Sequence, residues 1–156
     1  MIRLALLDDH LAAVSGLRRV LVHARDVEVL AAAADEVTLA RELRGRRPDI
    51  LIVGYEPARG DALSLCRRVK ARPGAPRVLL YTAYAGAALT IAARIAQADG
   101  LLDTSESAGT VIDVIRRMAG GEVVMPKVSR RAFEAAVARL DDRDQAQGSM
   151  SPRRIA

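Results

Sequence analysis

Short apolar runs alternate with stretches of helical periodicity five times along most of the chain. The runs are residues 2–7 (IRLALL), 27–33 (VEVLAAA), 50–53 (ILIV), 77–82 (RVLLYT) and 99–103. The stretches that follow them predict helices over residues 11–24, 36–46, 61–71, 87–97 and 107–119. Such alternation indicates parallel strands joined by right-handed crossovers, with helices on both faces of one sheet. The sequence therefore predicts one α/β domain.

The third run is the most apolar, and it indicates a strand at the centre of the sheet. Ile50 to Val53 are four consecutive apolar residues between Pro48 and Pro57, as in strands that are covered on both faces. Proteins of this class place working side chains at the carboxyl ends of such strands. This chain has Gly54 there. The glycine is typical either of a close backbone approach or of a site that lacks its side chain.

A further segment follows the five units. Gly120 and Gly121 predict the end of the fifth helix, and residues 126–144 predict a linker helix with Pro126 near its first turn. Residues 145–156, QAQGSMSPRRIA, are polar and predict a flexible linker.

Charge and cysteine content narrow the function classes. The net charge is +5, but many cations end predicted helices, where they compensate the helix dipole, so direct DNA binding by this part is not predicted. The single cysteine, Cys66, excludes an internal disulfide, fits a core position and favours the cytoplasm. No apolar run is long enough for a membrane span, and no signal peptide is visible.

The stretches LALLDDH, PDILIVG, VLLYTAY and ADGLLDT, in this order, resemble the signature stretches of bacterial response-regulator receiver domains. MAGGEVVMPKVSRR extends the resemblance to the passage from receiver to linker in the NarL/FixJ (LuxR-type) subfamily. The resemblance implies a flavodoxin-like (CheY-like) doubly wound sheet of five parallel strands, in the order 2-1-3-4-5, over residues 1–125.

The resemblance also implies a site for phosphoryl transfer onto an aspartate that ends the third strand, with Mg²⁺ held by acidic residues after the first strand. Asp8 and Asp9 match the acidic pair, and Thr82 matches the hydroxyl that holds the phosphate. Gly54 stands at the phosphoacceptor position. The lysine position is occupied by Thr104, with Asp103 one place away, and the aromatic switch position by Leu101.

We therefore expect a degenerate pocket without a catalytic residue. Glu56, two positions beyond Gly54, is a poor substitute acceptor, and Asp8 with Asp9 is expected to bind Mg²⁺ weakly if at all, since one of the usual three carboxylates is missing. Local readings stay open: Asp8 and Asp9 as helix caps, and Thr82 as a partner of nearby backbone groups. His10 is expected to be an exposed residue at the start of a helix.

The first and last helices of the domain carry apolar faces. We expect these faces to be mostly core, and part of them to form a dimer interface, as the resemblance implies. The residues are Val14, Leu17, Leu21, Val111, Ile112 and Ile115.

The predicted function is a phosphorylation-independent receiver module of a transcriptional regulator. MSPRRIA resembles the opening of a LuxR-type helix-turn-helix domain, so the module would control dimerisation and DNA binding of an attached domain outside this chain. Regulation is expected to come from constitutive dimerisation, from a partner protein, or from a small ligand in the vacated pocket. The alternative is a stand-alone pseudo-receiver that acts as a protein–protein adaptor. No enzyme is predicted, because GxGxxG, GxxxxGK[ST] and GxSxG motifs are absent.

Overall fold

The protein is described here by a computed structural model, which covers residues 1–56 and 61–148. Its sheet contains the strands β1 (Ile2–Leu7), β2 (Val27–Ala33), β3 (Ile50–Gly54), β4 (Arg77–Thr82) and β5 (Gly100–Asp103). All paired strands are parallel, and their order is β2-β1-β3-β4-β5. The fold predicted from the sequence is confirmed, including the central place of β3.

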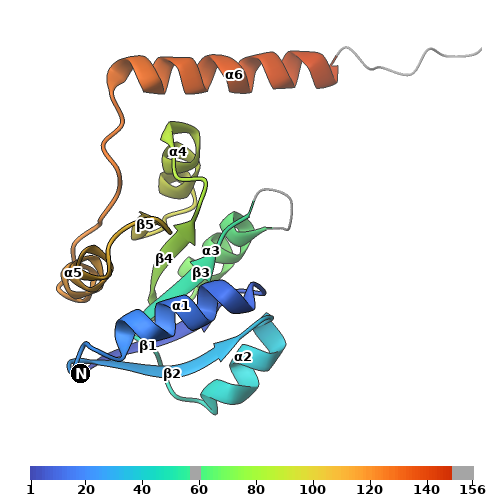
Figure 1. Ribbon diagram of the computed structural model, residues 1–156. Helices are drawn as coiled ribbons and strands as arrows, with labels where there is room; N and C mark the ends of the chain where they lie inside the picture. Colours follow the sequence, from blue (N-terminus) through green and yellow to red (C-terminus); the bar gives the residue numbers. More distant parts are fainter. Residues whose placement is uncertain (57–60, 149–156) are drawn as a thin grey trace, which may run out of the picture.

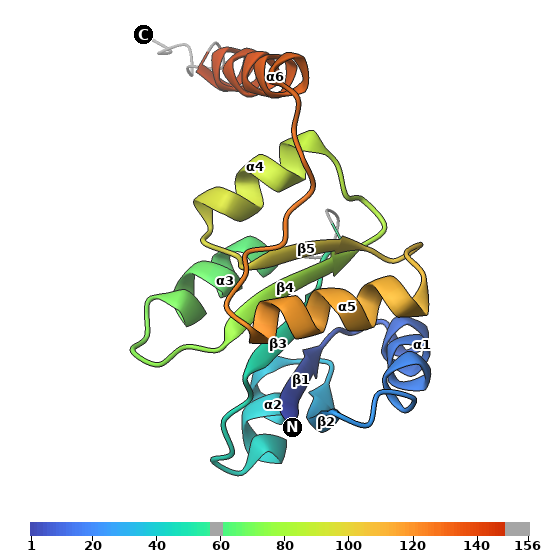
Figure 2. The same ribbon diagram turned by 90° about the vertical axis from the view of Figure 1, so that its left-hand side faces the viewer.

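Helices cover both faces of the sheet (Figure 1 and Figure 2). One face packs against α1 (Leu11–Leu21) and α5 (Ala108–Ala119), and the other against α2 (Glu36–Leu43), α3 (Ala62–Lys70) and α4 (Ala87–Ile95). Side chains therefore alternate along β3, with Ile50 and Ile52 on the face of α1 and α5, and Leu51 and Val53 on the opposite face. Burial on both faces explains why this run is apolar without interruption.

Several helices end earlier than their periodicity predicts. Helix α2 stops at Leu43 and not at Arg46, because Arg44 turns into the left-handed conformation with φ 50° and Gly45 follows with φ 78°. Glycine commonly terminates helices in this way, but the turn here begins at an arginine, one residue before the glycine.

Helix α6 (Arg130–Gly148) differs from the prediction at both ends. It begins at Arg130 because the segment before it runs beside β5, where the backbone N–H of Leu101 donates to the Val124 carbonyl at 3.0 Å. The Ser129 hydroxyl then accepts the Ala132 N–H at 3.1 Å, as an N-capping side chain does. The helix continues through residues 145–148, so a linker from residue 145 is wrong for those four residues, and residues 149–156 lie outside the described part.

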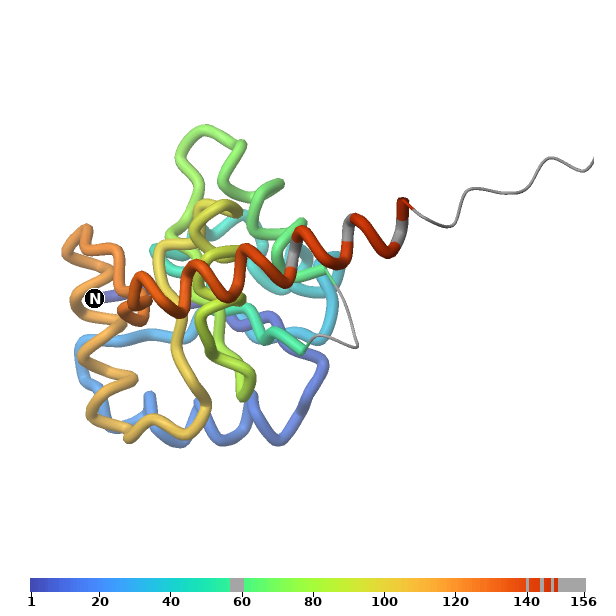
Figure 3. Tube along the Cα trace, turned by 90° about the horizontal axis from the view of Figure 1, so that it is seen from above, coloured from blue at the N-terminus to red at the C-terminus, as the bar shows by residue number. Residues whose placement is uncertain are grey.

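Helix α6 lies across α4, against which Ala136 is buried, and its second half continues past the rest of the domain (Figure 3). None of the described helices is both long enough and apolar enough to cross a membrane.

The apolar faces of α1 and α5 are mostly core, as the sequence predicts. Leu17, Leu21, Val111 and Ile115 are at most 5% exposed, because α1 and α5 turn these residues toward the sheet. Val14 and Ile112 alone among the six keep partial exposure. The faces are therefore mostly core, as expected, and a dimer interface that involves the remaining part stays a prediction.

Candidate functional site

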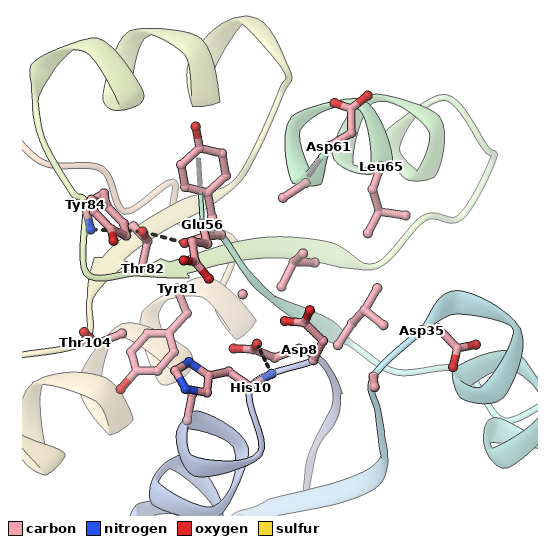
Figure 4. Close-up of a pocket in the computed structure, with 18 of the residues that line it drawn as sticks. Asp8, His10, Asp35, Glu56, Asp61, Leu65, Tyr81, Thr82, Tyr84 and Thr104 are labelled. Carbon is pink, nitrogen blue, oxygen red and sulfur yellow. Dashed lines mark hydrogen bonds between the residues drawn. The ribbon is translucent and has the colours of Figure 1, made fainter. Parts of the chain in front are cut away.

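A cleft of about 670 Å³ opens at the carboxyl edge of the sheet, over the ends of β1, β3 and β4 (Figure 4). The crevice outside the carboxyl ends of parallel strands is the usual place for a site in this class of fold. The structure brings together all six residues of the predicted degenerate pocket there. They are Asp8, Asp9, Gly54, Glu56, Thr82 and Thr104.

Two neighbouring positions that the resemblance also singles out, Leu101 and Asp103, do not line the cleft. Leu101 does not line the cleft but is 2% exposed, in the core cluster that includes Leu89 and Ala93 of α4. The Asp103 carboxylate accepts the N–H and the hydroxyl of Ser105, so it closes a turn, and Thr104 is the cleft residue at this strand end. The residue at the aromatic switch position is thus a buried leucine of the core.

Asp8 fills the space beside Gly54. A Cβ atom added to Gly54 would collide with the carboxylate of Asp8. Gly54 is the last residue of β3 and pairs with Tyr81 in ordinary parallel register, so the space taken by the Asp8 side chain, and not the backbone, is what favours glycine here. Any side chain at position 54 therefore requires the Asp8 side chain to move.

The Asp8 carboxylate is half-buried, and its Oδ1 accepts the backbone N–H of His10 at 2.8 Å. His10 is the exposed N-cap residue of α1 and makes no side-chain capping bond, so Asp8 supports the start of the helix without being its cap. Burial raises the pKa of Asp8, and the nearby charges of Asp9 and Glu56 raise it further, whereas the His10 N–H lowers it.

The Thr82 hydroxyl is occupied by the backbone of the surrounding loops. Thr82 is 1% exposed, and its Oγ1 donates to the Tyr55 carbonyl at 2.8 Å and accepts the Tyr84 N–H at 3.0 Å. A hydroxyl has one proton to donate, and here that proton goes to Tyr55. Thr82 thus joins the segments that follow β3 and β4, as the local reading of the sequence allowed.

Three further carboxylates reach the cleft from the starts of helices. Asp35 caps α2 by accepting the Thr38 N–H at 2.8 Å, and Asp61 caps α3 by accepting the Ser64 N–H at 3.0 Å. Glu36 pairs with Arg68 at 2.7 Å. The described lining thus contains six carboxylates, one arginine that is already paired, and no lysine.

This donor set does not fit the Mg²⁺ ion that the resemblance implies. Within residues 1–56 and 61–148, no three carboxylate, histidine or cysteine side chains are grouped so that they could hold a metal ion. Mg²⁺ requires near-octahedral oxygen ligands, and the strand end that would offer a further carboxylate carries Gly54.

Sequence reasoning missed the aromatic part of the site. Tyr55, Tyr81 and Tyr84 are the only tyrosines of the chain, and all three line the cleft. Each lies at or just after the carboxyl end of β3 or β4. This position in the sequence could have predicted that the three tyrosines line the cleft. Tyr84 is 56% exposed, and burial raises the pKa of Tyr81.

Comparisons with known proteins agree with this architecture, although no protein-family model matches the chain. A two-component response regulator of the LuxR family from an Aurantimonas species is 26% identical and superposes with a TM-score of 0.68 over 90% of this chain and 97% of that one. The chain has the receiver fold of response regulators. The receiver domain of NarL from Mycobacterium tuberculosis shares it at 23% identity and a TM-score of 0.69, over 78% of this chain and 98% of that one. The isolated apo receiver domain of RcsB from Salmonella enterica shares it at 18% identity and a TM-score of 0.71, over 91% and 99% of the two chains.

Curated relatives with sequence similarity to this receiver-fold chain are longer proteins. A protein-glutamate methylesterase/protein-glutamine glutaminase from Xanthomonas oryzae is 27% identical over 88% of this chain and 42% of its own length. A similarly named protein from Rhodopseudomonas palustris is 32% identical over 52% of this chain and 22% of its own. The chain spans less than half of the length of these relatives.

Proposed function

We propose that this chain is a receiver module that regulates its output without accepting a phosphoryl group. The observation that carries the proposal is the collision between the Asp8 carboxylate and any side chain at position 54. The acceptor position carries glycine, and an acceptor side chain would need the Asp8 carboxylate to leave its place.

The rest of the cleft supports the same reading. A bound phosphoryl group needs fixed cations or donors for its charge. The described lining has no lysine, its one arginine is paired with Glu36, and the Thr82 proton is donated to Tyr55. Six carboxylates around the cleft oppose the entry of an anion.

The buried Leu101 also favours a module held in one conformation. A two-state switch needs an element with two arrangements of similar free energy. Here the switch position carries a core leucine, and the Thr82 hydroxyl ties the loops after β3 and β4 together.

The output that we propose is control of dimerisation and DNA binding by an attached LuxR-type helix-turn-helix domain. Support comes from the LuxR-family neighbour and from RcsB, which has been solved bound to a promoter and of which this chain covers 63%. DNA contact would belong to the attached domain. The dimer would use faces other than the buried side of α1 and α5.

A second candidate is regulation of an attached catalytic domain, which is favoured by the longer methylesterase/glutaminase relatives. The chain itself carries the receiver-like part in either case. We do not propose an enzymatic activity for it.

Sedimentation velocity tests the proposal, with and without Mg²⁺ plus beryllofluoride as a phosphoryl mimic. The expected result is an unchanged distribution of species, and mass spectrometry after treatment with acetyl phosphate is expected to show no phosphoryl adduct. The isolated RcsB receiver domain, which has been solved in the presence of beryllofluoride, is treated in parallel to check that the mimic is active. A distribution that shifts only with the mimic would overturn the proposal.

A further inference from the structure

The segment between α5 and α6 is fastened to the edge of the sheet before the linker helix begins. Residues 122–125, which we call the clasp, run beside β5 and lead toward α6 (Figure 2). We propose that the clasp, with Arg77 as its positioning residue, fixes α6 on the domain and so holds the connection to an output domain in one arrangement. This inference rests on the proposed function, because that function places an output domain after α6.

The clasp pairs with β5 like a short additional strand. The Val124 N–H donates to the Asp99 carbonyl at 2.8 Å, and the Leu101 N–H donates to the Val124 carbonyl at 3.0 Å. Neighbouring side chains point to opposite faces, as they do in a strand. Val124 packs on the core cluster beneath α1 and α5, and Met125 on the cluster beneath α2, α3 and α4. The clasp therefore covers the outer edge of the sheet at β5.

Arg77 joins the clasp to a buried carboxylate. Its guanidinium donates to the Glu122 carbonyl at 2.6 Å and lies 3.4 Å from the carboxylate of Asp99. Asp99 is 8% exposed, and its carboxylate also accepts the Val78 N–H and the Lys70 ammonium, both at 2.8 Å. Hydrogen bonds from a charged donor are stronger than those between neutral groups. Arg77 thus links the clasp to a carboxylate that is itself anchored to α3 and β4.

The packing of α6 on α4 buries few side chains. Among the described side chains of α6, Ala136 alone is buried, while Ala132 and Val137 are half-buried and Phe133 is 48% exposed. The second half of the helix continues past the domain (Figure 3). Helices in proteins gain most of their stability from packing of an apolar face, and here that packing is small. The position of α6 therefore depends on the clasp that precedes it.

The clasp lies at the opposite end of β5 from the cleft. Val124 pairs with Gly100, the first residue of the strand, whereas the cleft residue Thr104 follows the last one. Each residue of a strand rises by about 3.3 Å, so the two ends of this strand are about 10 Å apart. A connection that is fixed at this end agrees with an output that is regulated without a phosphoryl group in the cleft.

Hydrogen exchange of backbone amides, followed by ¹H–¹⁵N NMR on the full chain, tests the role of Arg77. Arg77→Met keeps a long side chain but removes the bond to the clasp and the contact with Asp99, which retains its other two partners. The Leu101 and Val124 amides are expected to lose protection about tenfold relative to the Ile52 amide of the central strand.

Two further variants separate the clasp from general effects on stability. Arg3→Met is the matched control, because it removes an arginine–aspartate pair with Asp49 at the same end of the sheet, and it is expected to leave clasp protection unchanged relative to the core. Val124→Pro removes the N–H that bonds to Asp99 without altering a charged side chain. It is expected to lower the protection of the Leu101 amide as Arg77→Met does.

Variants of α6 test which element holds the other. Ala136→Glu places a charge in the contact with α4, and it is expected to lower protection of the Val137 amide about tenfold while the Leu101 amide stays protected. Ala135→Glu, at the exposed neighbouring position, is the control and is expected to change neither amide. Arg77→Met is expected to lower the protection of Val137 as well, because α6 follows the clasp.

Three results would overturn the inference. They are full protection of the clasp amides in Arg77→Met, an equal loss of their protection in Arg3→Met, and opening of the clasp in Ala136→Glu, which would show that α6 holds the clasp in place. Failure of the proposed function has a different signature, namely a sedimentation distribution of the parent chain that shifts with Mg²⁺ and beryllofluoride. That result needs no variant, so the two failures are distinguishable.

Discussion

The carboxylate of Asp8 lies where the side chain of residue 54 would begin, so the aspartate and Gly54 are steric partners across β1 and β3. The same carboxylate accepts the His10 N–H at 2.8 Å. A side chain at position 54 would therefore displace Asp8 and disturb its hydrogen bond at the start of α1.

Gly54→Ala is expected to destabilise the protein by about 1 kcal/mol, because Asp8 must leave its hydrogen bond to His10 to make room. Gly54→Asp is expected to cost more, since it adds a negative charge beside Asp8. Urea unfolding measures both values. In an Asp8→Ala background, Gly54→Ala is expected to become neutral or stabilising, because alanine suits a strand better than glycine does. Equal costs in the two backgrounds would contradict the steric coupling.

Thr82→Val is expected to destabilise the protein by about 1–3 kcal/mol, because it leaves the Tyr55 carbonyl and the Tyr84 N–H without their partner. Thr90→Val is a matched control: Thr90 is also buried and its hydroxyl bonds to the Gly86 carbonyl, but that carbonyl keeps the Thr90 N–H at 2.9 Å. Thermal or urea unfolding should give the smaller loss for Thr90→Val. If the order is reversed, the Thr82 hydroxyl does not hold the loops.

Asp8→Asn is expected to stabilise the protein at pH 7 by up to about 1 kcal/mol, the usual limit for a partly exposed charge. Burial raises the folded-state pKa of Asp8, so its ionisation costs stability as pH rises from the ordinary carboxyl value through the raised one. The two proteins should therefore converge at acid pH. Asparagine keeps an acceptor for the His10 N–H.

Asp35→Asn tests a carboxyl group whose pKa is shifted in the opposite direction to that of Asp8. Hydrogen bonds from the backbone N–H and the hydroxyl of Thr38 lower the pKa of Asp35, so its contribution to stability is present above the unfolded pKa and is lost as pH falls through the folded value. Asp35→Asn is thus expected to be less stable than the parent at pH 7. Unfolding followed between pH 3 and 7 separates the two cases, and parallel pH profiles for both variants would refute the assignment.

Cys66 is expected to resist thiol reagents in the folded protein. It is fully buried, and burial raises its pKa from 9.0 to about 11, which lowers the thiolate fraction about 100-fold. Reaction with a chromogenic disulfide reagent at pH 8 should be slow in buffer and fast in denaturing urea. Rapid reaction in buffer would show that α3 opens locally, since Cys66 packs against α4 through the Ala96 carbonyl.

Local patterns determined a large part of the fold. Residues 27–33 and 77–82 form strands with the boundaries that the sequence predicts, because apolar β-forming runs between turns encode strands directly. Boundaries that depend on distant contacts were missed. Helix α6 starts at Arg130 because the preceding segment pairs with β5, and no local pattern reports that pairing.

For the site, the order of residues along the chain determined which positions meet at the carboxyl edge of the sheet, including the glycine at the end of β3 and the threonine after β5. Only the tertiary structure decided what those residues do. That Asp8 fills the space beside Gly54, that the Thr82 proton goes to Tyr55, and that three tyrosines share one cleft are facts about distances between separate strands. Tertiary structure likewise decided which side of α1 and α5 is buried against the sheet. An apolar helical stripe looks alike in sequence whether it faces a sheet or a second molecule, and only packing distinguishes the two.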